Sequence, residues 1–172
     1  MINKNELLCV VDEYDTPQKP LPRHEVFSND YWRRTAHVWV LNDKNQVLCQ
    51  QRSFKKDNGA GKWEVIVGGH IGPDDNYFTG AVREVQEETG LPVNVSDLQL
   101  VKIYKANEYK EYRAVFYWKT DFQLHEIVRE EDEVEAVKFL DLKTVRNYLL
   151  YKKHEDWISP GYEKEMFSIL NI

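Results

Sequence analysis

Three glutamates stand close together near the middle of the chain, at Glu84, Glu87 and Glu88. If residues 78 to 89 form a helix, these side chains occupy positions i, i+3 and i+4 and share one helical face. Like charges on one stripe repel each other by roughly a few tenths of a kcal/mol per close pair, so stability alone gives no reason to assemble them. Carboxylate oxygens are the ligands that Mg2+ prefers. The cluster therefore predicts a bound cation.

The residues around the glutamates support a helix with one packed face. Phe78, Val82 and Val85 recur on the side opposite the glutamates, so this side can pack while the acidic side stays open. Gly90, with Pro92 just beyond it, predicts where the helix ends. A solvated acidic surface is the alternative interpretation, and for acidic triplets in general it is the more common one.

The spacing of the whole segment favours the metal site. Residues Gly69 to Leu91 fit the pattern G-x5-E-x7-R-E-U-x-E-E-x-G-U, with U aliphatic, and so resemble the Nudix box. Only Asp75 departs, because the family has Glu at that position. From about Leu7 to Leu142 the chain also resembles the branch of Nudix proteins related to isopentenyl diphosphate isomerase. The segments that carry this second resemblance are residues 36–40, 51–53, 56–57, 61–63 and 67–70.

The resemblance implies a catalytic metal centre on the predicted helix. The three glutamates would be ligands of Mg2+, or of Mn2+ in its place, and Glu84 is also a candidate base. The carbonyl group of Gly68 would be a further ligand, and Arg83 would orient the glutamates through ion pairs. Asp75 is one methylene shorter than the usual Glu, so a contact there would be longer or mediated by water.

Further candidates lie outside the box. By resemblance, Arg52 and Lys56 match positions that hold the substrate diphosphate in the isomerases; ordinary surface cations are the alternative. His70 and Glu111 correspond to metal-binding residues of the isomerases, and the alternatives are a structural histidine and a surface charge at a strand end. Trp63 could stack on a substrate, although a place in the core is the more common role of a tryptophan.

The residue before Gly69 and His70 separates a hydrolase from an isomerase. The isomerases have a cysteine there, whereas this chain has Gly68, and Cys49 belongs to an earlier predicted strand. An upstream histidine that binds metal in the isomerases is replaced by Arg33. Acid–base chemistry on carbon therefore lacks its main group. Hydrolysis of a phosphoanhydride needs positioning, metal ions and water instead.

We therefore expect a Mg2+-dependent Nudix hydrolase, a pyrophosphatase acting on a nucleoside diphosphate or a related small organic diphosphate by water attack on phosphorus. One alternative is an enzyme like isopentenyl diphosphate isomerase. Another is a Nudix-fold module that binds a diphosphate without turning it over. Degenerate binding modules tend to lose box glutamates, and all three are present here, which favours the enzyme.

Composition narrows the remaining classes. A chain of 172 residues, 42% hydrophobic and 30% charged, is typical of one soluble globular domain, here residues 1–172. A net charge of −6 argues against a nucleic-acid polymer or an anionic membrane as partner, and no stretch is long enough to span a bilayer. Cys9 and Cys49 are expected to be reduced core thiols of a cytoplasmic protein, with a disulfide between them left open. A homodimer is also left open, because the family often dimerises.

The expected fold is an α/β (α+β) Nudix fold, a mixed β-sheet sandwiched between helices. An N-terminal hairpin is expected at about residues 7–19, and a second hairpin between strands 35–41 and 46–51. Met166, Phe167 and Leu170 are expected to pack inward. The other expected elements are helical turns at 23–28, strands at 63–67, 98–104, 112–120 and 134–140, a helix at about 141–151 with Asp141 as N-cap, and a helix at about 162–171.

Overall fold

A mixed β-sheet with helices on both faces makes up the computed structural model, which describes residues 5–56, 58–152 and 154–172. Asp57, part of one segment that resembles the isomerases, lies outside the described residues. The strands are β1 (Leu7–Leu8), β2 (Leu21–Pro22), β3 (Arg33–Leu41), β4 (Gln46–Arg52), β5 (Trp63–Glu64), β6 (Gln99–Ala106), β7 (Glu111–Lys119) and β8 (Val134–Asp141). The helices are α1 (Arg23–Ser28), α2 (Tyr77–Thr89), α3 (Leu142–Arg146), a π-helix (Asn147–Lys152) and α4 (Glu163–Ile169).

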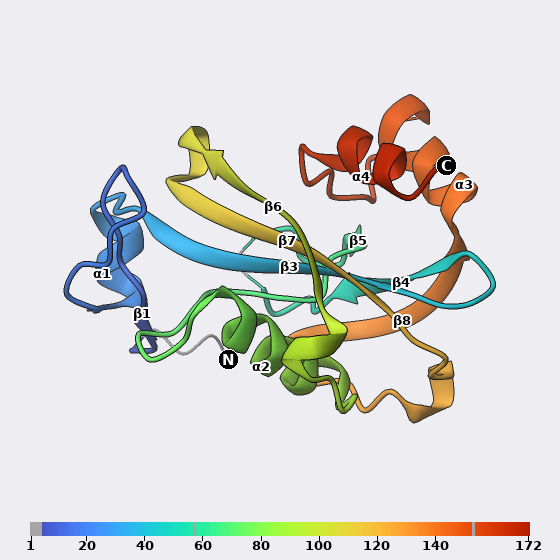
Figure 1. The fold of residues 1–172 in the computed structure, drawn as a ribbon, viewed down its shortest axis with the longest axis horizontal. Helices are drawn as coiled ribbons and strands as arrows, with labels where there is room; N and C mark the ends of the chain where they lie inside the picture. Colours follow the sequence, from blue (N-terminus) through green and yellow to red (C-terminus); the bar gives the residue numbers. More distant parts are fainter. Residues whose placement is uncertain (1–4, 57, 153) are drawn as a thin grey trace.

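Figure 1 shows the sheet between α2 on one face and α3 with α4 on the other. Two hydrophobic clusters fill these layers. One joins Val85 of α2 to β3 and β7, and the other joins Met166 and Phe167 of α4 to the opposite face of the sheet. Leu170 also packs there, as predicted. The predicted class, a mixed sheet sandwiched between helices, is confirmed.

The predicted hairpin between residues 35–41 and 46–51 is wrong beyond its turn. β3 and β4 share only the pair Leu41–Val47, and β4 then pairs along its length with β8. The edge of β3 that a hairpin would use is taken by residues 67–70, because Val38 donates to Val67 and Ala36 donates to Gly69, each at 2.9 Å. The other edge of β3 pairs in parallel with β7, beginning at Arg33 opposite Glu111. The sheet order is β5-β4-β3-β7-β6, with β8 on β4.

The N-terminal hairpin extends further than expected. The chain reverses after Asp12, whose N–H donates to the Thr16 carbonyl at 3.0 Å, but strand pairing continues to β1 with β2. The strand expected at 63–67 is shorter, since only β5 is regular and Val67 makes an isolated bridge to Val38.

Helix α2 has the ends that its sequence predicts. Asn76 accepts from the N–H groups of Phe78 and Thr79 in a capping box, which satisfies amides that have no partner within the helix. At the other end Gly90 adopts φ 69°, a left-handed conformation that glycine takes without steric cost. The acidic face, however, is not open as expected, because Glu84 and Glu88 are buried and only Glu87 is exposed.

The first C-terminal helix has the predicted length but two helical types, and the last helix is shorter than predicted. The helix expected at about 141–151 consists of α3, with Asp141 accepting from Lys143 N–H at 2.8 Å, followed by the π-helix. The helix expected at about 162–171 is α4. Cys9 and Cys49 are both buried, and neither is in a disulfide. Among the described helices, none combines the length and apolar character needed to cross a bilayer.

Candidate active site

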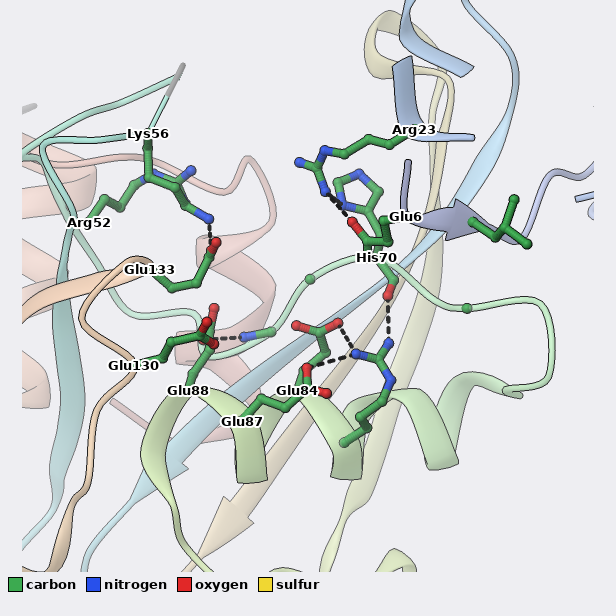
Figure 2. A pocket seen from close by; sticks show the side chains of 15 residues that line it. Glu6, Arg23, Arg52, Lys56, His70, Glu84, Glu87, Glu88, Glu130 and Glu133 are labelled. Atoms are coloured by element: carbon green, nitrogen blue, oxygen red, sulfur yellow. Dashed lines mark hydrogen bonds and ion pairs between the residues drawn. The ribbon is translucent and has the colours of Figure 1, made fainter. Parts of the chain in front are cut away.

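A polar pocket of about 700 Å³ opens beside α2. Figure 2 shows Glu84, Glu87 and Glu88 projecting from α2 on one side of it. The turn at residues 68–70 forms its back, as these residues also line it. Lys56 and Arg52 stand at one end and Arg23 at the other (Figure 2). The structure therefore brings together most of the residues that the sequence predicts for the site.

Glu84 and Glu88 are nearly buried, with exposed fractions of 9% and 7%. Glu88 accepts hydrogen bonds from the Gly68 N–H at 3.0 Å and from the Gln50 side chain at 3.1 Å. Burial raises the pKa of Glu84 to about 7, an effect that the charge of Glu87 reinforces. Burial also raises the pKa of Glu88, which has the negative charge of Glu84 beside it. Two neighbouring buried carboxylates of this kind favour a positive charge close to them.

Two glycines let the backbone approach these carboxylates. A Cβ atom on Gly69 would lie 2.5 Å from a Glu84 oxygen. Gly68 has φ 149°, and a Cβ atom there would overlap the carbonyl oxygen of Ala36. Glycine is therefore required at position 68 by the close approach of the turn to β3, whereas position 69 faces the flexible end of Glu84.

Arg83 ties the acidic face to the turn. Its guanidinium contacts Glu84 at 2.8 Å, Glu87 at 2.9 Å and Asp75 at 3.0 Å, and donates to the His70 carbonyl at 2.9 Å. Asp75 therefore makes a direct contact with Arg83 despite its shorter side chain. The arginine holds the glutamates in place, which is the role that the resemblance implies for it.

The two predicted phosphate anchors each have a carboxylate partner within the protein. Arg52 contacts the buried Glu64 at 2.8 Å, and Lys56 pairs with Glu133. Burial lowers the pKa of Lys56, and the neighbouring charge of Arg52 acts in the same direction. Burial raises the pKa of Glu64, although Arg52 opposes this shift. Phosphate oxygens would have to compete with these carboxylates for the two cations.

Four charged pocket residues are missing from the sequence-based prediction: Glu6, Arg23, Glu130 and Glu133. Arg23 begins α1, contacts Glu6 at 3.1 Å and reaches the His70 ring nitrogen Nδ1 at 3.2 Å. Glu130 and Glu133 come from the acidic loop before β8. The charge run of that loop was visible in the sequence, but only the pairing of β8 with β4 brings it to the pocket.

His70 lines the pocket as a neutral ring. Burial and the guanidinium groups of Arg23 and Arg33 lower its pKa well below the ordinary value. Arg23 can only donate, so Nδ1 accepts and the proton is on Nε2, which is buried without a partner in the described structure.

Glu111 and Trp63 are not brought to the pocket. Both carboxylate oxygens of Glu111 are engaged at 2.7 Å, one by Arg33 and one by Arg113. Trp63 packs against the core under the C-terminal helices, stacked on Trp157 with ring centres 6.2 Å apart. Its surroundings agree with the packing role that was the alternative to substrate stacking.

The donor atoms of the pocket fit a hard divalent cation. Glu84, Glu87 and Glu88 supply carboxylate oxygens, and one guanidinium, that of Arg83, contacts Glu84 and Glu87. Among the described residues, however, no three acidic, histidine or cysteine side chains converge as a ready-made metal group. Arg83 draws Glu84 and Glu87 to itself, whereas Glu88 turns towards Gly68 and Gln50. Metal binding would therefore require side-chain rotations.

Comparison with known proteins settles the family. The model of the NUDIX domain matches residues 31–162, which include the sheet, α2 and the pocket. The chain belongs to the Nudix family. Its relatives include proteins named as Nudix hydrolases.

Relatives with different activities resemble the chain. Nudix hydrolase 3 of Arabidopsis thaliana is 28% identical over 140 residues, which cover 74% of this chain and 18% of that protein. Isopentenyl-diphosphate Delta-isomerase 1 of Photorhabdus laumondii is 28% identical over 172 residues, covering 96% of this chain and 95% of the isomerase.

Solved structures agree on the fold. The crystal structure of DR0079 from Deinococcus radiodurans has a TM-score of 0.75 at 17% identity, covering 95% of this chain and 98% of the other. A bifunctional NMN adenylyltransferase/ADP-ribose pyrophosphatase from Francisella tularensis, complexed with AMP and a Mn ion, has a TM-score of 0.59 at 18% identity. It covers 81% of this chain and 41% of the other. At these identities the likeness establishes the Nudix fold alone.

Proposed function

We propose that this Nudix hydrolase is Mg2+-dependent and cleaves the diphosphate linkage of a nucleoside diphosphate or a related small organic diphosphate, by water attack on phosphorus. One observation carries the proposal: a single pocket contains the carboxylate face of α2 and, at its end, the cations Arg52 and Lys56. Such a pocket offers separate places for a metal-bridged phosphate and for phosphate oxygens held directly by protein.

The glutamates of α2 would hold the metal. Mg2+, or Mn2+ in its place, would neutralise charge on the phosphoryl oxygens and lower the pKa of a bound water. Glu88 would exchange its present partners for the metal, Glu84 would offer the oxygen that Arg83 does not hold, and the Gly68 carbonyl would be a further oxygen ligand. Arg83 would keep Glu84 and Glu87 oriented through its contact with the His70 carbonyl.

Arg52 and Lys56 would hold the substrate. Arg52 can grip a phosphate with two N–H groups, whereas Lys56 supplies one compact charge. Both are already positioned, Arg52 by Glu64 and Lys56 by Glu133. The Francisella tularensis neighbour is named an ADP-ribose pyrophosphatase and was solved with a Mn ion, which supports a diphosphate substrate and Mn2+ as a substitute metal.

The test is phosphate release from a panel of nucleoside diphosphates, dinucleotides, nucleotide sugars and isoprenoid diphosphates, with and without Mg2+. We expect turnover only with the metal, and a loss of about 100-fold or more in Glu84→Gln and in Glu88→Ala. Glu135→Gln changes an exposed glutamate of β8 and serves as the matched control. Turnover that is unchanged in both pocket variants, with the fold intact, would remove the site assignment.

A diphosphate-binding module without turnover is the second candidate. The observation in its favour is that the carboxylates are engaged by Arg83, Gly68 and Gln50 instead of converging on one point. Thermal shift with the same compounds separates the two functions. If compounds of the panel stabilise the protein and none of them is hydrolysed, the result would favour the binding module.

A further inference from the structure

The resemblance to the isomerases implies a metal held by His70 and Glu111, and the structure disagrees with this at both residues. Both side chains lie at one end of the sheet. His70 lies in the turn that bridges to Thr35 of β3, and Glu111 begins β7 opposite Arg33 of β3. A metal shared by them would need free lone pairs on both and room between them. Neither condition is met.

Glu111 has no free oxygen to offer. Arg33 Nη2 contacts one carboxylate oxygen at 2.7 Å, and Arg113 Nε contacts the other at 2.7 Å. The register of β3 and β7 fixes the first contact, because Arg33 stands directly opposite Glu111. The side chains of the cluster are 7%, 12% and 13% exposed for Arg33, Glu111 and Arg113, so none of them can turn out to water without opening the sheet end.

The space towards His70 is filled by a guanidinium and a phenyl ring. Arg33 lies on the Phe27 ring, 4.2 Å from its centre, and the same ring meets His70 edge-on at 5.6 Å. The contacts thus run from Glu111 through Arg33 and Phe27 to His70. On the far side of His70, Arg23 approaches Nδ1 at 3.2 Å and takes the lone pair that a metal would need.

Charge opposes a metal here as well. Among the described residues Glu111 contacts both Arg33 and Arg113, and Arg23 beside His70 is paired with Glu6. The charge of Asp30 also acts on Arg33, but two guanidinium groups in direct contact with Glu111 place positive charge against its carboxylate. A divalent cation would enter against that charge, in surroundings where repulsion is screened less than in water.

We infer that the guanidinium of Arg33 stands in this chain where the isomerase resemblance implies a metal ion, so that His70 and Glu111 do not bind metal. Arg33 is thus a positioning residue: it fixes Glu111 on one side and, through Phe27, the His70 wall of the pocket on the other. A divalent ion is confined to the glutamates of α2. The inference rests on the proposed function only for that remaining site.

Titration with Mn2+, followed by electron paramagnetic resonance of the free ion, tests the inference without any turnover. In His70→Asn and in Glu111→Gln we expect the number of bound ions to be unchanged and their affinity to stay within about twofold of the wild type. In Glu88→Gln we expect affinity to fall by about tenfold or more. Melting temperatures measured on the same samples report whether each variant is folded.

Loss of one bound ion, or a tenfold weaker affinity, in His70→Asn or in folded Glu111→Gln would overturn the inference. Glu111→Gln leaves two buried guanidinium groups without their partner and can prevent folding. His70→Asn leaves that ion cluster intact, so it decides the question if Glu111→Gln does not fold. Wild-type affinity in Glu88→Gln would instead remove the proposed metal centre on α2. The two failures are therefore distinguishable.

Discussion

At the scale of single residues, Gly68 has two separate effects. The resemblance to the isomerases places their cysteine at this position, so its absence removes the thiol needed for chemistry on carbon. The structure adds that no side chain fits, since φ is 149° and a Cβ atom would overlap the Ala36 carbonyl. The position is closed to a thiol by backbone geometry as well as by sequence.

Gly68→Cys should therefore lower stability without creating an isomerase. We expect the free energy of unfolding in urea to fall by about 2 kcal/mol or more, because the residue is forced into a conformation that side chains rarely adopt. Isomerisation of isopentenyl diphosphate, followed by NMR, should stay undetectable. Gly72→Ala is the control, since a Cβ atom there meets only Asp75 at 3.4 Å. A Gly68→Cys protein as stable as the wild type would contradict the clash.

Some site residues were predictable one by one, and others were not. The glutamates of α2, Arg83 and the Gly-Gly turn follow from spacing, because all of them belong to one local segment. Arg23 and Glu133 reach the pocket only through tertiary structure, and no local pattern marks them. Glu111 shows the converse, since a plausible metal ligand by position is occupied by Arg33 from the neighbouring strand.

At the scale of elements, carboxylates of the acidic loop before β8 (residues 130–133) pair with lysines of the loop after β4 (residues 53–56). Glu133 pairs with Lys56, its carbonyl accepts from the Ser53 N–H at 2.9 Å, and Asp132 pairs with Lys55. Under the proposed function, Glu133 of the free protein holds the place on Lys56 that a phosphate would take. Substrate binding would then exchange one anion for another and release the loop carboxylate.

Glu133→Gln should accordingly strengthen substrate binding. Loss of a partly buried competitor for Lys56 corresponds to roughly 1 kcal/mol, or a KM about threefold to tenfold lower. Steady-state kinetics with the best diphosphate of the panel measures it. Asp132→Asn alters the neighbouring exposed ion pair and should leave KM within about twofold. An unchanged or higher KM in Glu133→Gln would show that Glu133 does not compete with the substrate.

Elements also show where sequence patterns end. Helix α2 was predictable to within a residue, because its caps and its periodicity are local signals. The hairpin of β3 and β4 was predicted because two strands joined by a short turn usually pair with each other. The prediction failed because residues 67–70 take the edge of β3 and β8 takes the edge of β4. Partner choice in a sheet depends on segments that lie far away in the chain.

At the scale of the whole molecule, His37 makes one of the hydrogen bonds that join the sheet to the C-terminal segment. His37 of β3 lies 2.8 Å from the Tyr162 hydroxyl through Nδ1. Burial lowers the pKa of His37 to about 3, and the charge of Arg113 acts in the same direction. The folded protein therefore keeps this imidazole neutral at every pH at which an unfolded chain would begin to protonate it.

This difference makes His37 a source of acid sensitivity. Below about pH 6.5 the unfolded chain takes up a proton that the folded chain refuses, so stability falls as pH falls towards the folded pKa. Between pH 7 and pH 5 we expect the wild type to lose about 1–2 kcal/mol relative to His37→Gln, measured by urea unfolding of the metal-free proteins.

The comparison with His37→Gln is needed because other groups act in the opposite direction. The raised pKa values of Glu84 and Glu88 make the folded state bind protons first, so their contribution to stability grows on acidification. Both proteins contain these glutamates, and their effect cancels in the difference. Parallel stability curves for the two proteins would contradict the assignment to His37.

The pairing of β4 with β8 has a consequence for how the protein is made. Gln46 at the start of β4 pairs with Asp141 at the end of β8, so the strand that carries Arg52 finds its main partner only after most of the chain exists. The contacts of Arg52 with β5 are local, whereas Glu130 and Glu133 reach the pocket only once β8 has paired with β4. Pairing between such distant segments is typical of slow folding steps. The Nudix box is therefore a local sequence signal in a pocket that distant segments complete, and a chain that ended after α2 would contain the motif without the wall that Glu130 and Glu133 form.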